Sequence, residues 1–205
     1  MRTRVKICGI TRIEDALVAA QAGADAIGLV FAQASPRCVS VAEAAAICRA
    51  LPPFVSVVGL FVDADAAQVT QALGRVPLDL LQFHGSETPQ FCRQFNRPYI
   101  KAIAMREGID VHAEDRAFAD AAGLLLDAHV AGLSGGSGKT FDWSRVPRGL
   151  ARPIVLAGGL TPGNVADAIR QVRPYAVDVS SGVEQARGVK DAGKIAAFIE
   201  AVTTA

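Results

Sequence analysis

The sequence predicts a single (β/α)8 barrel, in which eight parallel strands alternate with helices over residues 1–205. Eight short apolar segments recur along the chain, and most of them precede a stretch with helical patterning. The 205 residues allow about 26 residues per unit, which suits a compact barrel. A doubly wound open sheet is the less favoured alternative, because no Gly-x-Gly-x-x-Gly follows the first strand.

The first five units repeat the order of strand, turn and helix. The first strand is expected at 5–8. Thr11 follows as a predicted helix N-cap with Glu14 three positions on, and the Ala-rich helix ends at Gly23. Continuous apolar strands of this kind are typical of a parallel sheet that is covered on both faces. In the next four units we expect strands at 26–31, 54–62, 78–83 and 99–104, and helices at 41–51, 64–73, 89–95 and 113–122.

The last three units carry Gly- and Ser-rich connections. Residues 132–140 resemble a nucleotide-binding P-loop, but that motif requires glycine at position 133, where the chain has Leu133. A ligand-covering loop or a flexible connector is therefore expected there. The remaining expected elements are strands at 124–126, 153–157 and 177–179, a helix capped by Thr161 and Pro162, and a final helix at 192–202.

Composition and charge favour a small ligand over a macromolecular partner. Lys and Arg total 21 against 20 Asp and Glu, and neither sign forms a long run, so neither nucleic acid nor an anionic membrane is expected. The longest purely apolar segment, 57–62, is far shorter than the roughly 20 residues of a membrane span. We expect a cytoplasmic protein, and the sequence leaves a monomer and a homodimer both open.

The four cysteines give no sign of a metal or redox site. Cys8, Cys38, Cys48 and Cys92 form no Cys-x-x-Cys pair, and no histidine lies at metal-ligand spacing. Each is expected as a reduced thiol, and a small buried hydrophobe is the default interpretation. Cys8 is the exception because it ends the first strand.

The C-terminal ends of barrel strands form the catalytic face of this fold, so polar residues there are the first candidates for function. Strand alternation places Lys6 on the same side as Cys8, where its ammonium would favour the thiolate while burial would oppose it. The candidates are Cys8, Arg37, Gln82, His84, Asp127, the loop at 135–138, Gly158, Gly159, Asp178, Ser180, Ser181 and Gly182.

Several candidates have a specific chemistry. Asp127 leaves an apolar strand, where a carboxyl group can retain a proton and act as an acid, although a loop cap is the alternative. The planar guanidinium of Arg37 can bind a carboxylate through two parallel hydrogen bonds, and the alternative is a surface arginine without a ligand. Gly158-Gly159 and Ser181-Gly182 follow the seventh and eighth strands, where backbone N–H groups can form a phosphate site.

Taken together, the motifs resemble phosphoribosylanthranilate isomerase along almost the whole chain. The motifs are Lys6-Ile-Cys-Gly-Ile-Thr11, Ser35-Pro-Arg37, Gln82-Phe-His-Gly85, Leu126-Asp127, Gly135-Gly-Ser-Gly138 with Phe141-Asp-Trp143, Ala157-Gly-Gly-Leu160 and Asp178-Val-Ser-Ser-Gly-Val-Glu184. Their order at strand ends is more specific than any single motif. The resemblance implies the TIM-barrel fold and an enzyme that needs neither metal nor organic cofactor.

The resemblance also implies a reaction and a role for each candidate. The reaction is the Amadori rearrangement of N-(5-phosphoribosyl)anthranilate to 1-(2-carboxyphenylamino)-1-deoxyribulose 5-phosphate in tryptophan biosynthesis. Asp127 would be the general acid and Cys8 the general base. Another phosphosugar-binding barrel enzyme, or a non-catalytic sensor of a phosphorylated metabolite, is the alternative. Arg37 would bind the anthranilate carboxylate, Gln82, His84 and Asp178 other parts of the substrate, and Gly158, Gly159, Ser181 and Gly182 the phosphate.

Overall fold

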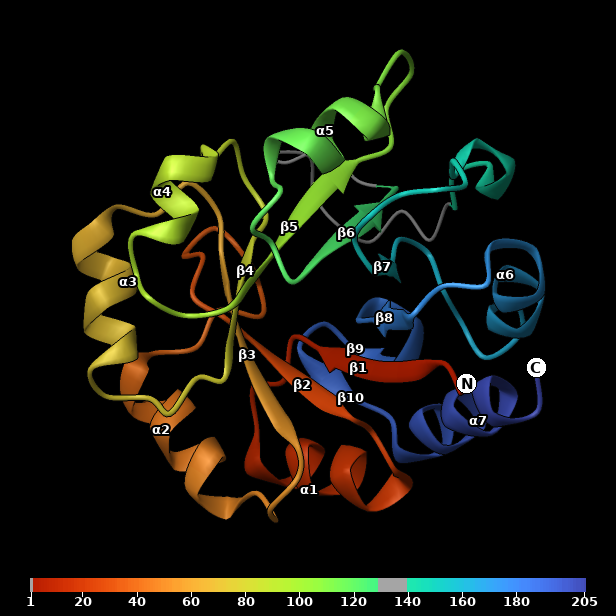
Figure 1. Cartoon of the computed structure of the whole chain (residues 1–205). Helices are drawn as coiled ribbons and strands as arrows, with labels where there is room; N and C mark the ends of the chain where they lie inside the picture. The colour runs from red at the N-terminus through yellow and green to blue at the C-terminus, as the bar shows by residue number, and fades with distance from the viewer. Residues whose placement is uncertain (1, 129–139) are drawn as a thin grey trace.

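The computed structural model describes residues 2–128 and 140–205 and shows a closed parallel barrel surrounded by helices (Figure 1). The strands are hydrogen-bonded in chain order, and β8 pairs with β1 to close the ring. The predicted TIM-barrel fold is therefore confirmed. The barrel strands are β1 (Arg4–Cys8), β2 (Ala26–Val30), β3 (Ser56–Phe61), β4 (Leu80–Phe83), β5 (Tyr99–Ala104), β6 (Gly123–Asp127), β7 (Ile154–Leu156) and β8 (Ala176–Val179).

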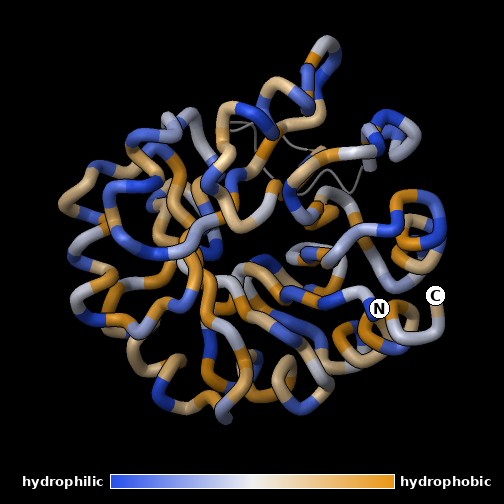
Figure 2. The backbone as a smooth tube through the Cα atoms, viewed as in Figure 1, coloured by the Kyte–Doolittle hydropathy of each residue, from blue (hydrophilic) through white to orange (hydrophobic). Residues whose placement is uncertain are grey.

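Helices cover the outer face of the barrel. Apolar residues follow the strands in the centre of the molecule, and hydrophilic residues lie mostly on the outer helices and loops (Figure 2). None of the helices in the two described stretches is long and apolar enough to cross a membrane. The helices are α1 (Ile13–Ala22), α2 (Val41–Ala50), α3 (Ala66–Leu73), α4 (Pro89–Arg93), α5 (Val111–Ala117), α6 (Val165–Val172) and α7 (Ala192–Thr203).

Two buried clusters show which way each strand residue points. Leu124 and Leu126 belong to the large cluster between strands and helices, whereas Leu125 belongs to a separate cluster with Ile100, Ala102, Val155 and Ala176. Because strand residues alternate between faces, this second cluster fills the barrel interior. Asp127, two positions beyond Leu125, therefore points inward at the mouth.

The first helix begins differently from the expectation. Arg12, not Thr11, occupies the N-cap position of α1 and provides no side-chain cap, so the predicted capping box with Glu14 is wrong. The Thr11 hydroxyl instead donates a hydrogen bond to the carbonyl of Gly188 at 2.5 Å. The predicted end of the helix is confirmed, because Gly23 adopts the left-handed conformation.

The third strand begins two residues later than expected. Phe54 was assigned to it, but its side chain is fully exposed and its φ is +72°, which is outside the extended region. Pro52 and Pro53 precede it and supply no backbone N–H for a sheet. The strand therefore starts at Ser56, whose N–H bonds the carbonyl of Asp25.

Two predicted helices shift because other residues cap them. The helix expected at 113–122 is α5 and starts earlier, since the side chain of Asp110 accepts from the N–H of Ala113. The helix expected to be capped by Thr161 and Pro162 is α6, with Asn164 at its N-cap position. The start of α6 therefore lies farther from the preceding glycine pair than expected.

The sixth and eighth units contain elements that the sequence did not predict. In the described part of the sixth unit, only a 3-10 helix, η1 (Trp143–Arg145), follows β6. The eighth unit contains the 3-10 helix η2 (Ser181–Val183) and a hairpin of β9 (Glu184–Ala186) and β10 (Val189–Lys190) before α7. The hairpin lies close to β1 in Figure 1, consistent with the bond between Thr11 and Gly188.

Candidate active site

Cys8 lies at the mouth of the barrel, where the residue is 6% exposed. Its register partner on β2 is Gly28, and a Cβ atom on that glycine would lie 2.7 Å from Cys8 Sγ and 3.0 Å from Lys6 Nζ. Both side chains therefore face the same space, as strand alternation predicted. The absence of a side chain at Gly28 makes room for them.

Lys6 forms a buried ion pair with Asp178. The two residues are register partners across the β1–β8 seam, and Lys6 Nζ donates to Asp178 Oδ1 at 2.9 Å. Only 6% and 8% of their side chains are exposed. Burial lowers the pKa of Lys6, but Asp178 and Cys8 raise it by more. Asp178 therefore first compensates the charge of a buried ammonium.

Opposing effects act on the pKa of Cys8, and the net shift is upward. Burial is the chief cause, and the negative charge of Asp178 adds to it. The ammonium groups of Lys6 and Lys190 act in the opposite direction. A thiol in this setting is a strong base once deprotonated, but only a small fraction is thiolate at neutral pH.

Asp127 belongs to a short polar chain that crosses from β6 to β4. Its Oδ2 lies 3.2 Å from His84 Nε2, and Gln82 Nε2 lies 2.9 Å from His84 Nδ1. Gln82 is fully buried and Asp127 is 8% exposed. If the Gln82 amide donates to Nδ1, the proton of neutral His84 is on Nε2 and faces the carboxyl group. Gln82 and His84 are thus placed to orient Asp127.

Cys8 and Asp127 come from opposite parts of the ring. In the closed barrel β6 lies three strands from β1, with β7 and β8 between them. Both side chains point inward at the C-terminal ends of their strands. A small molecule bound at the mouth would therefore meet a thiol on one side and a carboxyl group on the other.

Arg37 reaches the mouth from the loop after β2. Gly9, with a φ of +73°, lets the arginine stem pass, since a Cβ there would lie 2.4 Å from Arg37 Cδ. The guanidinium donates from Nε to Glu184 Oε1 at 2.7 Å and from Nη2 to Glu184 Oε2 at 2.8 Å. Arg37 is thus held by a buried carboxylate and is not a free surface arginine.

Lys190 and Glu184 are site residues to which the sequence analysis gave no role. Lys190 Nζ donates to Glu184 Oε1 at 3.0 Å, and 1% of the lysine side chain is exposed. Its charge also acts on Cys8. The segment Ala186-Arg187-Gly188-Val189 carries a recognisable turn glycine, so the hairpin had a local signal. The burial of Lys190 had none.

The two predicted phosphate loops lie against each other. A Cβ on Gly182 would lie 1.9 Å from the carbonyl oxygen of Leu160, so the loop after β8 contacts the loop after β7 through backbone. Gly158 and Gly159 both have positive φ, at +85° and +68°. Asn164 stabilises this loop by donating to the carbonyl of Gly159 at 3.0 Å. Glycine is therefore favoured at both positions, because other residues rarely adopt a positive φ.

A large cavity lies at the end of the barrel opposite the mouth. This cavity of about 1120 Å³ is lined by residues such as Arg2, Trp143, Pro153 and Tyr175, which lie at or before the N-terminal ends of β1, β7 and β8. It lies away from the predicted site residues. The predicted loop at 135–138 lies outside the described residues.

A closed barrel with buried acidic, basic and thiol groups gathered at its C-terminal mouth defines a (β/α)8-barrel enzyme of the type that acts on small molecules. Comparison with known proteins identifies the family. The model of the family described as N-(5'phosphoribosyl)anthranilate (PRA) isomerase matches residues 5–201. The N-(5'-phosphoribosyl)anthranilate isomerase of Pseudomonas putida (strain W619) is 62% identical over 202 residues, which are 98% of each chain. That of Alcanivorax borkumensis is 60% identical over 98% of this chain and 95% of the relative.

Solved structures agree with the sequence relatives. The phosphoribosyl anthranilate isomerase of Thermotoga maritima has a TM-score of 0.91 and 41% identity, covering 99% of this chain and 100% of the other. A phosphoribosyl anthranilate isomerase in complex with reduced 1-(o-carboxyphenylamino)-1-deoxyribulose 5-phosphate has a TM-score of 0.88 and 40% identity, with 99% and 100% covered. The chain belongs to the N-(5'-phosphoribosyl)anthranilate isomerase family, whose members catalyse an isomerisation in tryptophan biosynthesis.

Proposed function

We propose that this isomerase uses Asp127 as the general acid and Cys8 as the general base of the Amadori rearrangement of N-(5-phosphoribosyl)anthranilate. The observation that carries the proposal is their position on inward-facing strand ends at opposite parts of the mouth. The reaction needs one group that gives a proton and another that takes one, on different sides of the sugar.

The proposed steps move protons without any net oxidation. The carboxyl group of Asp127 gives its proton to the furanose ring oxygen, the C1–O bond breaks, and the nitrogen lone pair forms an iminium. The thiolate of Cys8 then removes the proton from C2, which gives the enolamine. Protonation at C1 and loss of the enol proton produce the ketone. The raised pKa of Cys8 makes the thiolate basic enough to attack a carbon acid.

The other site residues are proposed to bind the substrate. Arg37 would bind the anthranilate carboxylate, and Asp178 the sugar hydroxyls in addition to Lys6. Gln82 and His84 contribute to substrate binding through Asp127, which they orient. The backbone at Gly158, Gly159, Ser181 and Gly182 would bind the phosphate, a proposal supported by the contact between the two loops.

We also propose that residues 1–205 act as one catalytic domain in the cytoplasm, as a monomer or a homodimer. The single closed barrel and the even balance of charges favour this proposal. The substrate is a small phosphoribosyl compound, as indicated by the relative that was solved with a reduced phosphorylated product.

Steady-state kinetics on single variants tests the mechanism. Phosphoribosylanthranilate is generated in situ from anthranilate, and its loss is followed by fluorescence. Cys8→Ala and Asp127→Asn should each lower kcat by about 10²- to 10⁴-fold, the usual contribution of a general acid or base. Cys92→Ala is the matched control, since Cys92 is a fully buried thiol on α4 and its loss should leave kcat near the wild-type value.

Two results would contradict the mechanism or the binding assignment. Near wild-type kcat for Cys8→Ala or for Asp127→Asn would refute the acid and base roles. Arg37→Ala should raise KM about 10- to 150-fold, because a hydrogen-bonded charge is lost. An unchanged KM would refute the carboxylate role. Turnover by the wild type itself separates the enzyme from a sensor.

A further inference from the structure

The guanidinium of Arg37 is bound along one edge. Nε and Nη2 donate to the two oxygens of Glu184 at 2.7 and 2.8 Å in a bidentate pair. A guanidinium carries five N–H donors, so this pair leaves the end formed by Nη1 and the second hydrogen of Nη2. The N–H groups at that end form a second, outer fork, whose spacing matches the two oxygens of a carboxylate.

Glu184 is fixed by contacts that do not involve Arg37. Its Oε1 also accepts from Lys190 Nζ at 3.0 Å, and its backbone carbonyl accepts from Lys194 Nζ at 2.7 Å. Lys190 Nζ in turn donates to the carbonyl of Ser180 at 3.1 Å. With 6% of the Glu184 side chain and 1% of the Lys190 side chain exposed, neither has space to change rotamer freely.

The hairpin that carries these residues is tied to the first strand-helix connection. The N–H of Lys190 donates to Asp15 Oδ2 on α1 at 3.0 Å. Gly9, the first residue after β1, packs closely against the arginine stem, since a Cβ added to Gly9 would lie 2.4 Å from Arg37 Cδ. The guanidinium is therefore held from the hairpin side and its stem from the β1 side.

The charges of the cluster favour a bound anion. An isolated pair of Arg37 and Glu184 is neutral, and a second carboxylate would be attracted by one partner and repelled by the other. Lys190 adds a positive charge beside the shared oxygen. The three groups together carry one net positive charge, in surroundings where charge interactions are only weakly screened.

We propose that Glu184 and Lys190 are positioning residues that aim the outer fork of Arg37, which hydrogen-bonds no residue of the described stretches, at the aromatic carboxylate of the substrate, and so make the enzyme specific for a carboxylated aryl amine. This inference takes one point from the proposed function, namely that the fork faces the carboxylate of the substrate. Glu184 sets the orientation of the guanidinium, and Lys190 preserves the net charge of the cluster.

Two stable ligands test the proposal by binding alone. Reductive amination of ribose 5-phosphate with anthranilate or with aniline gives two 1-arylamino-1-deoxyribitol 5-phosphates that differ by one carboxylate. Isothermal titration calorimetry gives a Kd for each, and their ratio measures recognition of the carboxylate. For the wild type we expect the carboxylated ligand to bind about 10- to 150-fold more tightly, as for one hydrogen-bonded charge.

Glu184→Gln removes a charge that repels the ligand carboxylate, but it also holds the guanidinium less strongly. We expect the loss of orientation to dominate, so that the ratio falls about tenfold. In the Arg37→Ala background the same substitution should change the ratio no further. The matched control is Glu87→Gln, which removes a buried carboxylate in the loop after β4 that is paired with Lys101 at 3.1 Å. It should lower stability but keep the ratio of the wild type. Lys190→Met supplies the same test if Glu184→Gln does not fold, and should also lower the ratio.

Equal weakening of both ligands by Glu184→Gln would overturn the proposal, since it would indicate a general structural role. A further loss in the Arg37→Ala background would overturn it as well. The test does not depend on turnover. A wild type that discriminates between the ligands through Glu184 but fails to convert phosphoribosylanthranilate would refute the proposed mechanism and leave the positioning role standing.

Discussion

Removal of Lys6 should strongly destabilise the barrel, because it leaves Asp178 as an unpaired buried charge. The two groups are 2.9 Å apart, with side chains 6% and 8% exposed, and they join the first and last strands of the ring. Breaking a buried pair by removing one partner typically costs about 3–5 kcal/mol, and we expect a loss of about 4 kcal/mol in the free energy of unfolding here. That is a large part of the roughly 5–15 kcal/mol by which a protein of this kind is stable.

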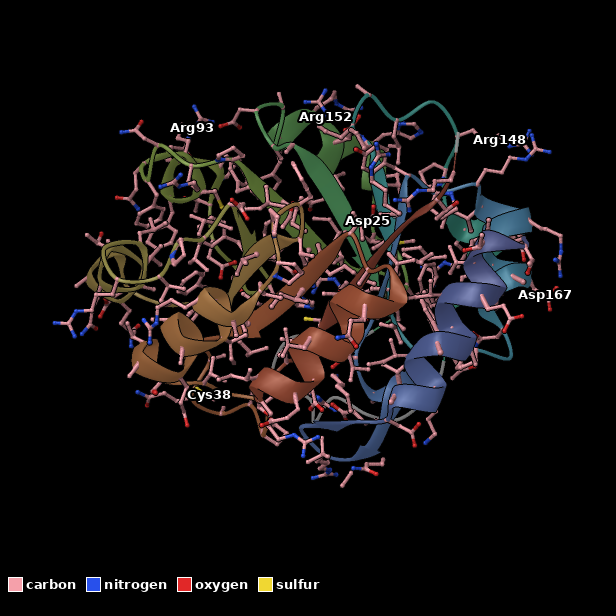
Figure 3. All side chains as sticks on the ribbon, turned by 90° about the horizontal axis from the view of Figure 1, so that it is seen from below. Asp25, Cys38, Arg93, Arg148, Arg152 and Asp167 are labelled. Carbon is pink, nitrogen blue, oxygen red and sulfur yellow. The ribbon has the colours of Figure 1, made fainter. Side chains whose placement is uncertain are left out.

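Urea unfolding at pH 7 measures the effect for Lys6→Met, Asp178→Leu and the double variant. Each single substitution leaves one buried charge, whereas the double substitution leaves none. We therefore expect the double variant to recover most of the lost free energy of unfolding. The control is Arg170→Met, which breaks the exposed pair with Asp167, a residue that points away from the body in Figure 3 and is 70% exposed. That change should cost at most about 1 kcal/mol.

The reasoning would be refuted by either of two results. If Lys6→Met costs no more than Arg170→Met, the Lys6 ammonium does not compensate a buried charge. If the double variant is as unstable as Lys6→Met, the loss comes from packing rather than from the unpaired carboxylate of Asp178. A recovery in the double variant is therefore the deciding observation.

Two further predictions concern the base and the phosphate loops. Because the pKa of Cys8 is raised, chiefly by burial, the rate at which iodoacetamide alkylates Cys8, followed by mass spectrometry, should still increase with pH above pH 8 as the thiolate forms; a plateau already reached at pH 7 would contradict this. Gly182→Ala places a Cβ 1.9 Å from the carbonyl oxygen of Leu160, so the two loops must move apart. The KM measured by steady-state kinetics should therefore rise. The free energy of unfolding measured in urea should fall by about 1–3 kcal/mol. Gly163→Ala is the control, since its nearest contact is at 3.8 Å, and unchanged behaviour of Gly182→Ala would refute the close approach.

The barrel was predictable because its strands carry a local and repetitive signal. Continuous apolar segments such as 26–30 and 123–126 are unusual outside a sheet that is buried on both faces. Strand parity alone placed Lys6 on the same side as Cys8, and the buried cluster around Leu125 then shows that Asp127, two positions further on, faces inward. These positions depend on the two-residue period of a strand, which no tertiary contact changes.

The errors occur where the decisive contact is distant in sequence. Thr11 has the composition of a helix cap, but its hydroxyl bonds Gly188, which is 177 positions away along the chain. The carboxylate that holds Arg37 was not predicted, because Glu184 comes from a hairpin that was not expected. Lys190 is a charged residue in a polar segment, and only the closure of the ring buries it. No local pattern contains that information.

The surroundings of Cys8 show why a thiol can serve as a base in this position. Lys6, Arg37 and Lys190 are opposed by the carboxylates of Asp178 and Glu184, so the cations exceed the anions by one before the thiol ionises. Ionisation of Cys8 would make this group of charges neutral, which favours the thiolate, but burial of the thiol itself outweighs this effect and the net shift of the Cys8 pKa is upward. Each carboxylate therefore permits its cation to be buried, and together they leave the thiol basic. A full set of unpaired cations would stabilise the thiolate further but would weaken it as a base.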